Sequence, residues 1–384
     1  MALILPKFCD TFSRLIATAS VSSLDPNFDM SNQPVADLLA TWLADIGFAV
    51  EIMQVKSNPG KVNLIARLGQ GSGGLVLSGH TDTVPYDESK WDQDPFLLTE
   101  KDNRYYGLGT SDMKCFFPIV FEALKEIDLG KLTKPLIILA TCDEECTMAG
   151  AKFLADTKCP LGRYALIGEP TGLKPVYMHK GTLSEKIKLI GQSGHSSDPS
   201  LGNNALEGMN TVINRLIKWR TELQSRETNS LFKVPVPTLN FGSIHGGDNP
   251  NRICGECEMK IEARFLPHMS IDEVRASIRT AIMDAVDGTG LTIEFDRIFP
   301  GLPGMETDRQ SEIVAQAEKI TGKEAGTVAF GTEGPFLNSL GMDTVILGAG
   351  DIEVAHQANE YLPMDRIEPM KEIIKQLINH FCNK

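Results

Sequence analysis

Short apolar runs that are followed by a metal-type ligand recur along this chain, and they restrict its fold more than any other feature. Runs of this kind span 75–77, 136–139, 165–167 and 345–347. The ligand-type residues at these run ends, or in nearby turns, are His80, Asp82, Asp112, Glu144, Glu145, Glu169 and His356. Open α/β sheets build their active sites at the carboxyl ends of strands. The sequence therefore predicts that one sheet edge assembles a metal centre.

Strand-like and helix-like segments alternate over the first part of the chain. Strand-like runs lie near 49–55, 62–68, 75–79, 136–141 and 164–168. Helical periodicity covers 8–48 with a polar break at 22–34, and it returns at 114–127 and 149–157. This alternation is typical of an α/β fold with a mostly parallel sheet flanked by helices.

The middle of the chain follows another pattern. Alternating apolar residues begin at Ser184, a long amphipathic helix covers 204–223, and further strand-like, helical and strand-like segments follow to Phe295. The resulting order, βαββαβ, is the split βαβ arrangement of ferredoxin-like α+β folds. We predict that 182–297 is a small domain inserted into a catalytic domain, which is formed by 1–181 and 298–384.

Charge and apolar patterning exclude some classes of partner. The formal net charge of −13 argues against a surface for nucleic acid or an anionic membrane. No stretch reaches about 18 consecutive apolar residues, so no membrane span is expected. The eight cysteines have irregular spacing, with a lone C-x-x-C at Cys254 and Cys257, which favours core packing in a reducing cytoplasm.

The ligand-type residues favour a centre with two metal ions. Imidazoles and carboxylates together suit zinc, and also cobalt or manganese. Two histidines with several acids exceed the needs of one tetrahedral zinc, but they suit two ions about 3.5–4 Å apart that share a carboxylate. Such a pair lowers the pKa of a shared water toward neutrality.

Neighbouring acids indicate a division of roles. Asp82 follows His80 by two residues, a spacing at which its carboxylate can accept the second ring N–H of the histidine. The adjacent carboxylates of Glu144 and Glu145 repel each other unless cations or protons neutralise them. One of the two can bind metal while the other acts as a general base.

Two competing motifs are incomplete. Gly107 and Gly109 lack the third glycine of a dinucleotide-binding fingerprint, and they are more consistent with a turn that presents Asp112. Ser193 lacks the closing glycine of a nucleophile elbow, which argues against Ser-His-Asp hydrolysis.

Several short segments identify a family. They span 78–85, 106–114, 143–145, 168–171, 194–197 and 355–357. With them, the chain resembles the dinuclear-zinc metallohydrolases that include aminoacylases and carboxypeptidases, over nearly its whole length. Further segments at 179–181, 195–199, 245–248, 251–253 and 331–336 resemble members that deacetylate N2-acetyl-L-ornithine.

The resemblance implies a role for each ligand-type residue. Asp112 would bridge two divalent ions, expected to be Zn²⁺ with Co²⁺ as a substitute, and a cis peptide bond would follow it. The other implied ligands are His80 and Glu169 for one ion, and Glu145 and His356 for the second. Glu144 would be the general base, and Asp82 would orient His80.

The inserted domain would supply residues for the substrate. The resemblance implies that His195 donates a hydrogen bond to the oxyanion, with help from Asn251. Arg264 is the first candidate to grip the substrate carboxylate, and Arg252 is the second. Glu333 would pair with the ornithine ammonium. In the family the inserted domain acts as a lid and as the contact of a homodimer.

The expected activity is metal-dependent hydrolysis of N2-acetyl-L-ornithine to ornithine and acetate in arginine biosynthesis. The alternatives are a desuccinylase of succinyl-diaminopimelate, another N-acyl-amino-acid hydrolase or dipeptidase, and a catalytically inactive binding homologue. Cys115 departs from the family, which usually has glycine there. We expect it to be a small residue at the start of a helix, although a thiol open to oxidation near the metals is the alternative.

Overall fold

The computed structural model describes residues 5–56 and 58–383. These residues form two compact units, of which the first comprises the chain up to Tyr177 together with 307–326 and 332 onward. The second comprises 178–306 and 327–331, so it contains the whole predicted insertion, 182–297. Residues 1–4 and 384 of the predicted catalytic segments lie outside the described residues. The lid and dimer-contact roles of the insertion remain predictions.

A mixed sheet forms the centre of the first unit. Its strands run in the order β1 (Ala49–Gln54), β2 (Val62–Leu68), β6 (Leu136–Thr141), β3 (Leu75–His80), β7 (Tyr164–Ile167), β15 (Asp343–Ile346) and β8 (Val176–His179). The four strands from β6 to β15 are parallel to one another, whereas β1, β2 and β8 pair antiparallel with their neighbours. β8 runs across the boundary into the second unit, where it pairs with β13 (Met305–Glu306); β14 (Gly326–Val328) also pairs with it.

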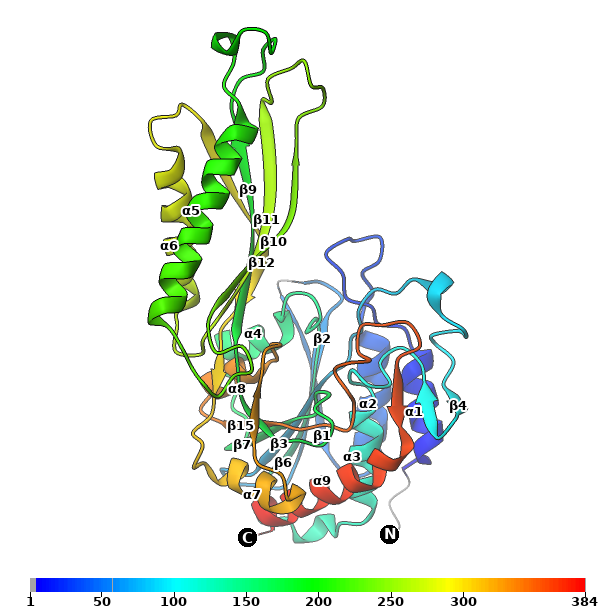
Figure 1. The fold of residues 1–384 in the computed structure, drawn as a ribbon. Coiled ribbons are helices and arrows are strands. Elements are labelled where there is room, and N and C mark those ends of the chain that lie inside the picture. The colour runs from blue at the N-terminus through cyan, green and yellow to red at the C-terminus, as the bar shows by residue number, and fades with distance from the viewer. Residues whose placement is uncertain (1–4, 57, 384) are drawn as a thin grey trace. The chain divides into compact units, whose positions relative to one another are not determined.

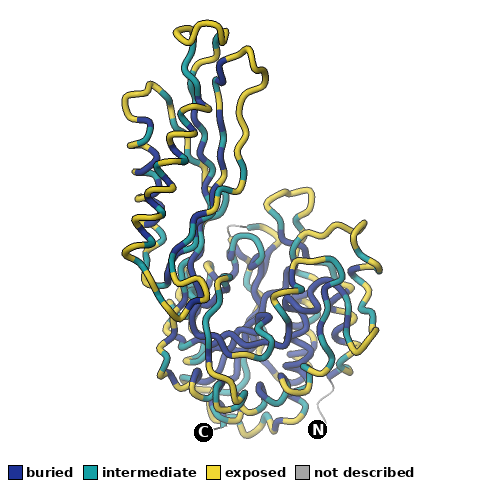
Figure 2. Tube along the Cα trace, viewed as in Figure 1, coloured by how far each residue is buried: buried dark blue, intermediate teal, exposed yellow. Residues whose placement is uncertain are grey.

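The central strands read as continuous apolar runs because both faces of the sheet are covered. Every residue of β3 and β6 is buried, and Figure 2 shows the central strands as the darkest part of this unit. The covering helices are α1 (Phe8–Ala17), α2 (Gln33–Asp45), α3 (Phe116–Lys125), α4 (Ala149–Asp156), α7 (Glu312–Thr321), α8 (Gly334–Ser339) and α9 (Ile367–Cys382). Among them, α3 packs on α9 and α4 packs on α8.

Short elements complete the first unit. A small sheet joins β16 (Tyr361–Pro363), β5 (Arg104–Tyr106) and β4 (Thr99–Lys101). The sequence did not predict it, because strands of three residues are too short to show an alternating pattern. Single 3₁₀ turns occur at Glu88–Lys90, Leu129–Lys131 and Met364–Arg366, and a fourth, Pro199–Leu201, belongs to the second unit.

The second unit is a four-stranded antiparallel sheet with two helices. The elements follow the chain as β9 (Gly181–Ile190), α5 (Ala205–Arg226), β10 (Thr238–Gly246), β11 (Glu256–Phe265), α6 (Ile271–Val286) and β12 (Thr292–Leu302). The strand order β10-β11-β9-β12 is that of a βαββαβ fold. Figure 1 shows α5 and α6 side by side along the sheet, and their apolar faces share one core with it.

The predicted fold class is therefore confirmed, with a mostly parallel sheet flanked by helices and a separate antiparallel α+β unit. Within the described residues, none of the helices combines the length and the apolar character needed to cross a membrane.

Candidate metal centre

The carboxyl ends of three neighbouring parallel strands carry most of the site. His80 is the last residue of β3, the pair Glu144 and Glu145 lies in the turn after β6, and Glu169 follows β7. Because β6, β3 and β7 are adjacent and parallel, these side chains leave the sheet at one edge. Asp112 comes from the loop before α3. The oxygen and nitrogen atoms of these residues form two groups of potential ligands, His80 with Glu144 and Glu169, and His80 with Asp112 and Glu145.

The carboxylate of Asp112 lies between two imidazoles. Its Oδ1 is 3.1 Å from Nε2 of His80, and its Oδ2 is 3.4 Å from Nε2 of His356. His356 also lies close to Glu145, with 2.9 Å between Nε2 and Oε2. Asp112 thus presents one oxygen to each histidine, which is the arrangement that a bridging carboxylate requires. The peptide bond between Asp112 and Met113 is cis, as the resemblance implied.

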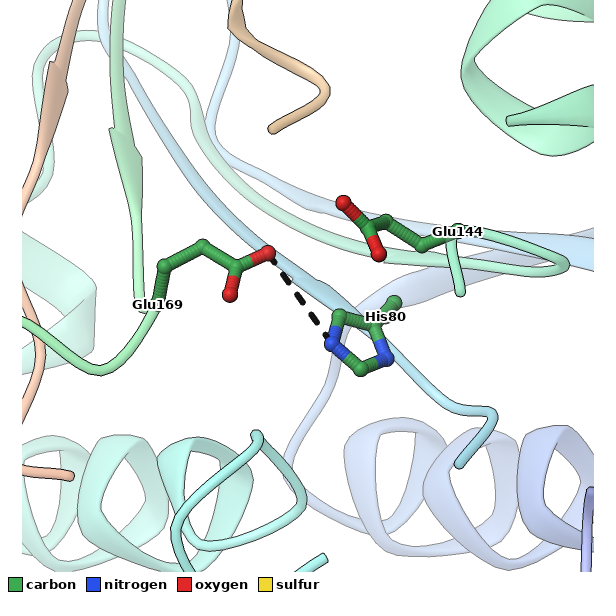
Figure 3. Close-up of side chains that lie close together, drawn as sticks. All are labelled: His80, Glu144 and Glu169. Atoms are coloured by element: carbon green, nitrogen blue, oxygen red, sulfur yellow. Dashed lines mark ion pairs between the residues drawn. The ribbon is translucent and has the colours of Figure 1, made fainter. Parts of the chain in front are cut away.

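His80 is fixed by its other ring nitrogen. Nδ1 lies 2.9 Å from the backbone carbonyl oxygen of Asp82, so Nε2 faces Asp112 and Glu169. In Figure 3 the side chains of Glu169 and Glu144 converge on the ring of His80, and the dashed line marks the 3.9 Å approach between Oε1 of Glu169 and Nε2. An imidazole whose second nitrogen is anchored to a carbonyl is oriented for metal binding.

The predicted contact between the Asp82 carboxylate and the His80 ring is wrong. The carboxylate oxygen is 3.8 Å from Nδ1, and the backbone carbonyl of the same residue accepts the ring N–H instead. The carboxylate accepts the backbone N–H groups of Glu144 and Glu145, at 3.3 and 3.2 Å. Asp82 therefore holds the turn that presents both glutamates, a contact that residue spacing alone does not reveal.

The buried acids of the site are under-compensated. Burial raises the pKa of Glu144 and of Glu169 well above the usual carboxyl value, and neighbouring carboxylates add to the rise. Burial, followed by the charge of Asp112, also raises the pKa of Glu145. Oε1 of Glu145 and Oε1 of Glu169 are buried and accept no hydrogen bond from any described residue. Orphaned carboxylate oxygens in a ring of acids and imidazoles fit divalent cations, which would compensate this charge.

The two histidines respond to the same acids. Burial lowers the pKa of His80, but the hydrogen bond with Asp112 and the nearby glutamates outweigh this effect and raise it. Hydrogen bonds with Asp112 and Glu145 raise the pKa of His356 to about 11, although 52% of its side chain is exposed. Since a metal ion requires the neutral imidazole, metal binding at this site must release protons.

Glu333 lies near the centre, but it is deeply buried. Only 1% of it is exposed, and its Oε2 is 3.5 Å from the hydroxyl of Ser78 in β3. Burial raises its pKa to about 7, and its charge contributes to the raised pKa values of Glu144 and Glu169. The predicted pairing of Glu333 with a substrate ammonium remains a prediction.

The remaining predicted residues belong to the second unit. His195 is exposed in the loop after β9, where its Nδ1 is 2.7 Å from the hydroxyl of Ser197. This loop pairs with the segment that contains Asn251 and Arg252 through a backbone bridge, so the structure brings these three residues together. Arg264 lies apart from them on β11, where it donates to Glu262 and to the carbonyl of Ala329. Their roles toward the substrate remain predictions.

Cys115 is a buried residue at the N-terminal cap of α3, in agreement with the expected position at a helix start. Burial raises the pKa of its thiol well above the usual range. A buried neutral thiol is a poor nucleophile and a poor metal ligand, so the packing role is favoured.

The sequence did not single out two buried residues that support the site. Lys61 is 2.7 Å from Asp29 and 3.7 Å from Asp143, the residue before the glutamate pair. Glu360 accepts hydrogen bonds from backbone N–H groups of the Asp112 loop, and burial raises its pKa to about 8 although these amides oppose the rise. For Glu360, the only signal was its position four residues after His356.

Comparison with known proteins gives the family. Peptidase family M20/M25/M40 matches residues 76–380. The chain is 47% identical to the acetylornithine deacetylase of Photorhabdus laumondii over 98% of each chain, and 46% identical to that of Pectobacterium carotovorum over 100% of each. The M20 metallo-carboxypeptidase of Sulfolobus solfataricus has the same fold, with a TM-score of 0.78 at 18% identity over 97% of this chain and 99% of that one. The protein belongs to peptidase family M20/M25/M40.

Proposed function

We propose that this protein is a metal-dependent amide hydrolase that converts N2-acetyl-L-ornithine and water to L-ornithine and acetate, a step of arginine biosynthesis. The observation that carries the metal-dependent chemistry is the Asp112 carboxylate, which presents one oxygen to His80 and the other to His356. The substrate rests on relatives that share 45–47% of their residues with this chain over almost its full length.

Two divalent cations, Zn²⁺ with Co²⁺ as a substitute, are the cofactors of this proposal. Asp112 would bridge them, His80 and Glu169 would complete one site, and Glu145 and His356 the other. When bound, such a pair lowers the pKa of water and polarises an amide carbonyl. The orphaned oxygens of Glu145 and Glu169 support this assignment.

Glu144 is the proposed general base. Its carboxylate lies with His80 and Glu169 in one group of side chains, and it is almost completely buried. It would take a proton from the attacking water and return that proton to the nitrogen of the leaving amine. Asp82 supports this role, because its carboxylate fixes the backbone of the turn that carries Glu144.

The second unit supplies the proposed substrate contacts. His195, with Asn251, would donate hydrogen bonds to the oxyanion, and Arg264 or Arg252 would pair with the α-carboxylate. The unit would also act as the lid and as the contact of a homodimer. A reducing cytoplasmic location is part of the same proposal, because the described cysteines are all free.

The test is a comparison of substrates under controlled metal content. Purified protein is assayed with N2-acetyl-L-ornithine, N-succinyl-L,L-diaminopimelate and a dipeptide, with added Zn²⁺ or Co²⁺ and with a chelator. We expect metal-dependent release of ornithine that is much faster than the other reactions. Faster desuccinylation or dipeptide cleavage would keep the metal centre and replace the substrate. Absence of turnover in metal-loaded protein would favour an inactive binding homologue.

A further inference from the structure

The carboxylate of Glu360 joins two loops that carry ligand-type residues. Its Oε1 accepts the backbone N–H groups of Ser111 and Asp112, at 2.6 and 2.9 Å, and its Oε2 accepts that of Gly109 at 3.0 Å. Only 1% of the residue is exposed, so water cannot replace these contacts. Three donors from one loop converge on a single side chain, and that side chain lies four residues after His356.

Further bonds connect the same two loops. The Ser111 hydroxyl donates to the carbonyl of Asp351 at 3.1 Å and accepts the N–H of Asp351 at 2.8 Å. The N–H of Gly107 donates to the backbone carbonyl of Glu360 at 3.1 Å. These contacts join backbone to backbone or to one hydroxyl. Glu360 is the only one of these contacts whose partner is the N–H of Asp112 itself.

We propose that Glu360 is a positioning residue that fixes the Asp112 loop against the His356 loop and thereby sets the affinity of the site for divalent cations. The inference rests on the proposed metal centre. A bridging carboxylate must keep both oxygens aimed at fixed points, and the observed 3.1 and 3.4 Å separations from the two imidazoles depend on the backbone position of Asp112. Glu360 holds that backbone from the side of His356.

A carboxylate suits this task better than an amide. It offers two oxygens that only accept, and the three N–H groups here use both of them. A glutamine in the same place could keep the contacts with Ser111 and Asp112, but its NH₂ group would face the N–H of Gly109. The loop would then lose a contact and gain a repulsion between two donors without any large change in side-chain volume.

The experiment measures metal binding in the absence of substrate. Metal-depleted full-length protein is titrated with Co²⁺ and Zn²⁺ by calorimetry, as wild type, Glu360→Gln and Glu185→Gln. Glu185 is the matched control, because it is also fully buried but lies in β9 of the second unit, where it pairs with Arg275 and Arg279. The same substitution there lowers thermal stability without touching the Asp112 loop.

We expect Glu360→Gln to bind metal about 10–100-fold more weakly than wild type, as is typical when a group that orients a ligand is lost. Glu185→Gln should bind metal as wild type does. Turnover by Glu360→Gln should recover when the metal concentration is raised, because Glu360 does not touch the reacting atoms. If Glu360→Gln does not fold, Glu360→Asp, which is too short to reach all three amides, carries the same test.

Three outcomes separate this inference from the function on which it rests. Wild-type affinity in Glu360→Gln, or equal weakening in Glu185→Gln, would overturn the role of Glu360 and leave the metal centre intact. Wild type that binds no divalent metal would overturn both proposals. Metal binding as expected, together with hydrolysis of a different N-acyl amino acid, would support the role of Glu360 and replace only the substrate.

Discussion

Buried carboxylates occur in both units of this protein, but their surroundings differ. In the second unit, Glu185 is fully buried, and each of its oxygens accepts from a guanidinium, at 2.8 Å from Arg275 and 2.6 Å from Arg279. In the first unit, Glu145 and Glu169 each have a buried oxygen for which no described residue provides a donor. Thus one unit neutralises its buried acid with its own cations, and the other leaves a net negative charge at the strand ends.

The difference separates a structural charge from a functional one. A buried ion pair whose lone pairs are satisfied stabilises one arrangement of helix and strand and leaves no capacity for a ligand. Buried acids that repel one another lower stability until a cation or a proton neutralises them. The location of under-compensated charge therefore identifies the metal centre independently of the family.

The largest expected effect comes from the general base. Glu144→Gln should lower turnover by about 10²–10⁴-fold, because the loss of a positioned base typically costs that much. Metal content should stay at the wild-type level, since Glu144 is not one of the proposed ligands. Steady-state kinetics with elemental analysis of the same samples checks both points. Wild-type turnover would remove Glu144 from this role.

Breaking the satisfied pair should affect stability instead of chemistry. Glu185→Gln leaves the buried guanidinium of Arg275 without its counter-charge, at a cost on the order of 3 kcal/mol of unfolding free energy. Thermal and urea unfolding measure the loss. Turnover per folded molecule should stay close to wild type, and a large fall in turnover at unchanged stability would contradict the comparison.

Adding cations should stabilise only the under-compensated site. Zn²⁺ or Co²⁺ at about 100 times its dissociation constant should add roughly 2.7 kcal/mol to the stability of the folded protein. The unfolding midpoint should therefore rise with metal and fall again with chelator. In Asp112→Asn most of this response should disappear, whereas Glu185→Gln should start from a lower midpoint and rise by as much as wild type.

The smallest expected effect concerns a surface carboxylate. Hydrogen bonds with Lys371 and Lys375 lower the pKa of Glu126 to about 2, and the side chain is 44% exposed. Because the folded pKa lies below the unfolded value, these contacts stabilise the fold above about pH 4.5, and the contribution disappears as pH falls toward 2. Glu126→Gln should cost at most about 1 kcal/mol at pH 7. Unfolding curves of mutant and wild type should converge at low pH, and a constant difference would contradict this assignment.

The fold could be predicted where apolar periodicity is long. The apolar runs of β3 and β6 and the alternating residues of β9 and β11 gave strand positions close to those observed, because burial on one face or both leaves a clear pattern in the sequence. The three-residue strands β4, β5 and β16 were missed, because their pairing depends on partners that are distant in the chain.

The site could be predicted for side chains that end a strand and not for those that support them. His80 and Glu169 were found because they follow apolar runs. The bonds from the Asp82 carboxylate to the turn after β6, and from Glu360 to the Asp112 loop, join segments that are more than sixty and more than two hundred residues apart in the chain. Residue spacing contains no information about such contacts.

The sequence by itself determined the alternation of strands and helices, the inserted βαββαβ segment and the residue types that can hold metal, because these depend on local periodicity and on side-chain chemistry. Tertiary structure alone decided which carboxylate oxygen faces which imidazole, which buried acids are left without a donor, and which backbone groups hold the ligand loops. These properties arise only when distant segments are packed together, since packing decides which polar groups lose water and which find a partner.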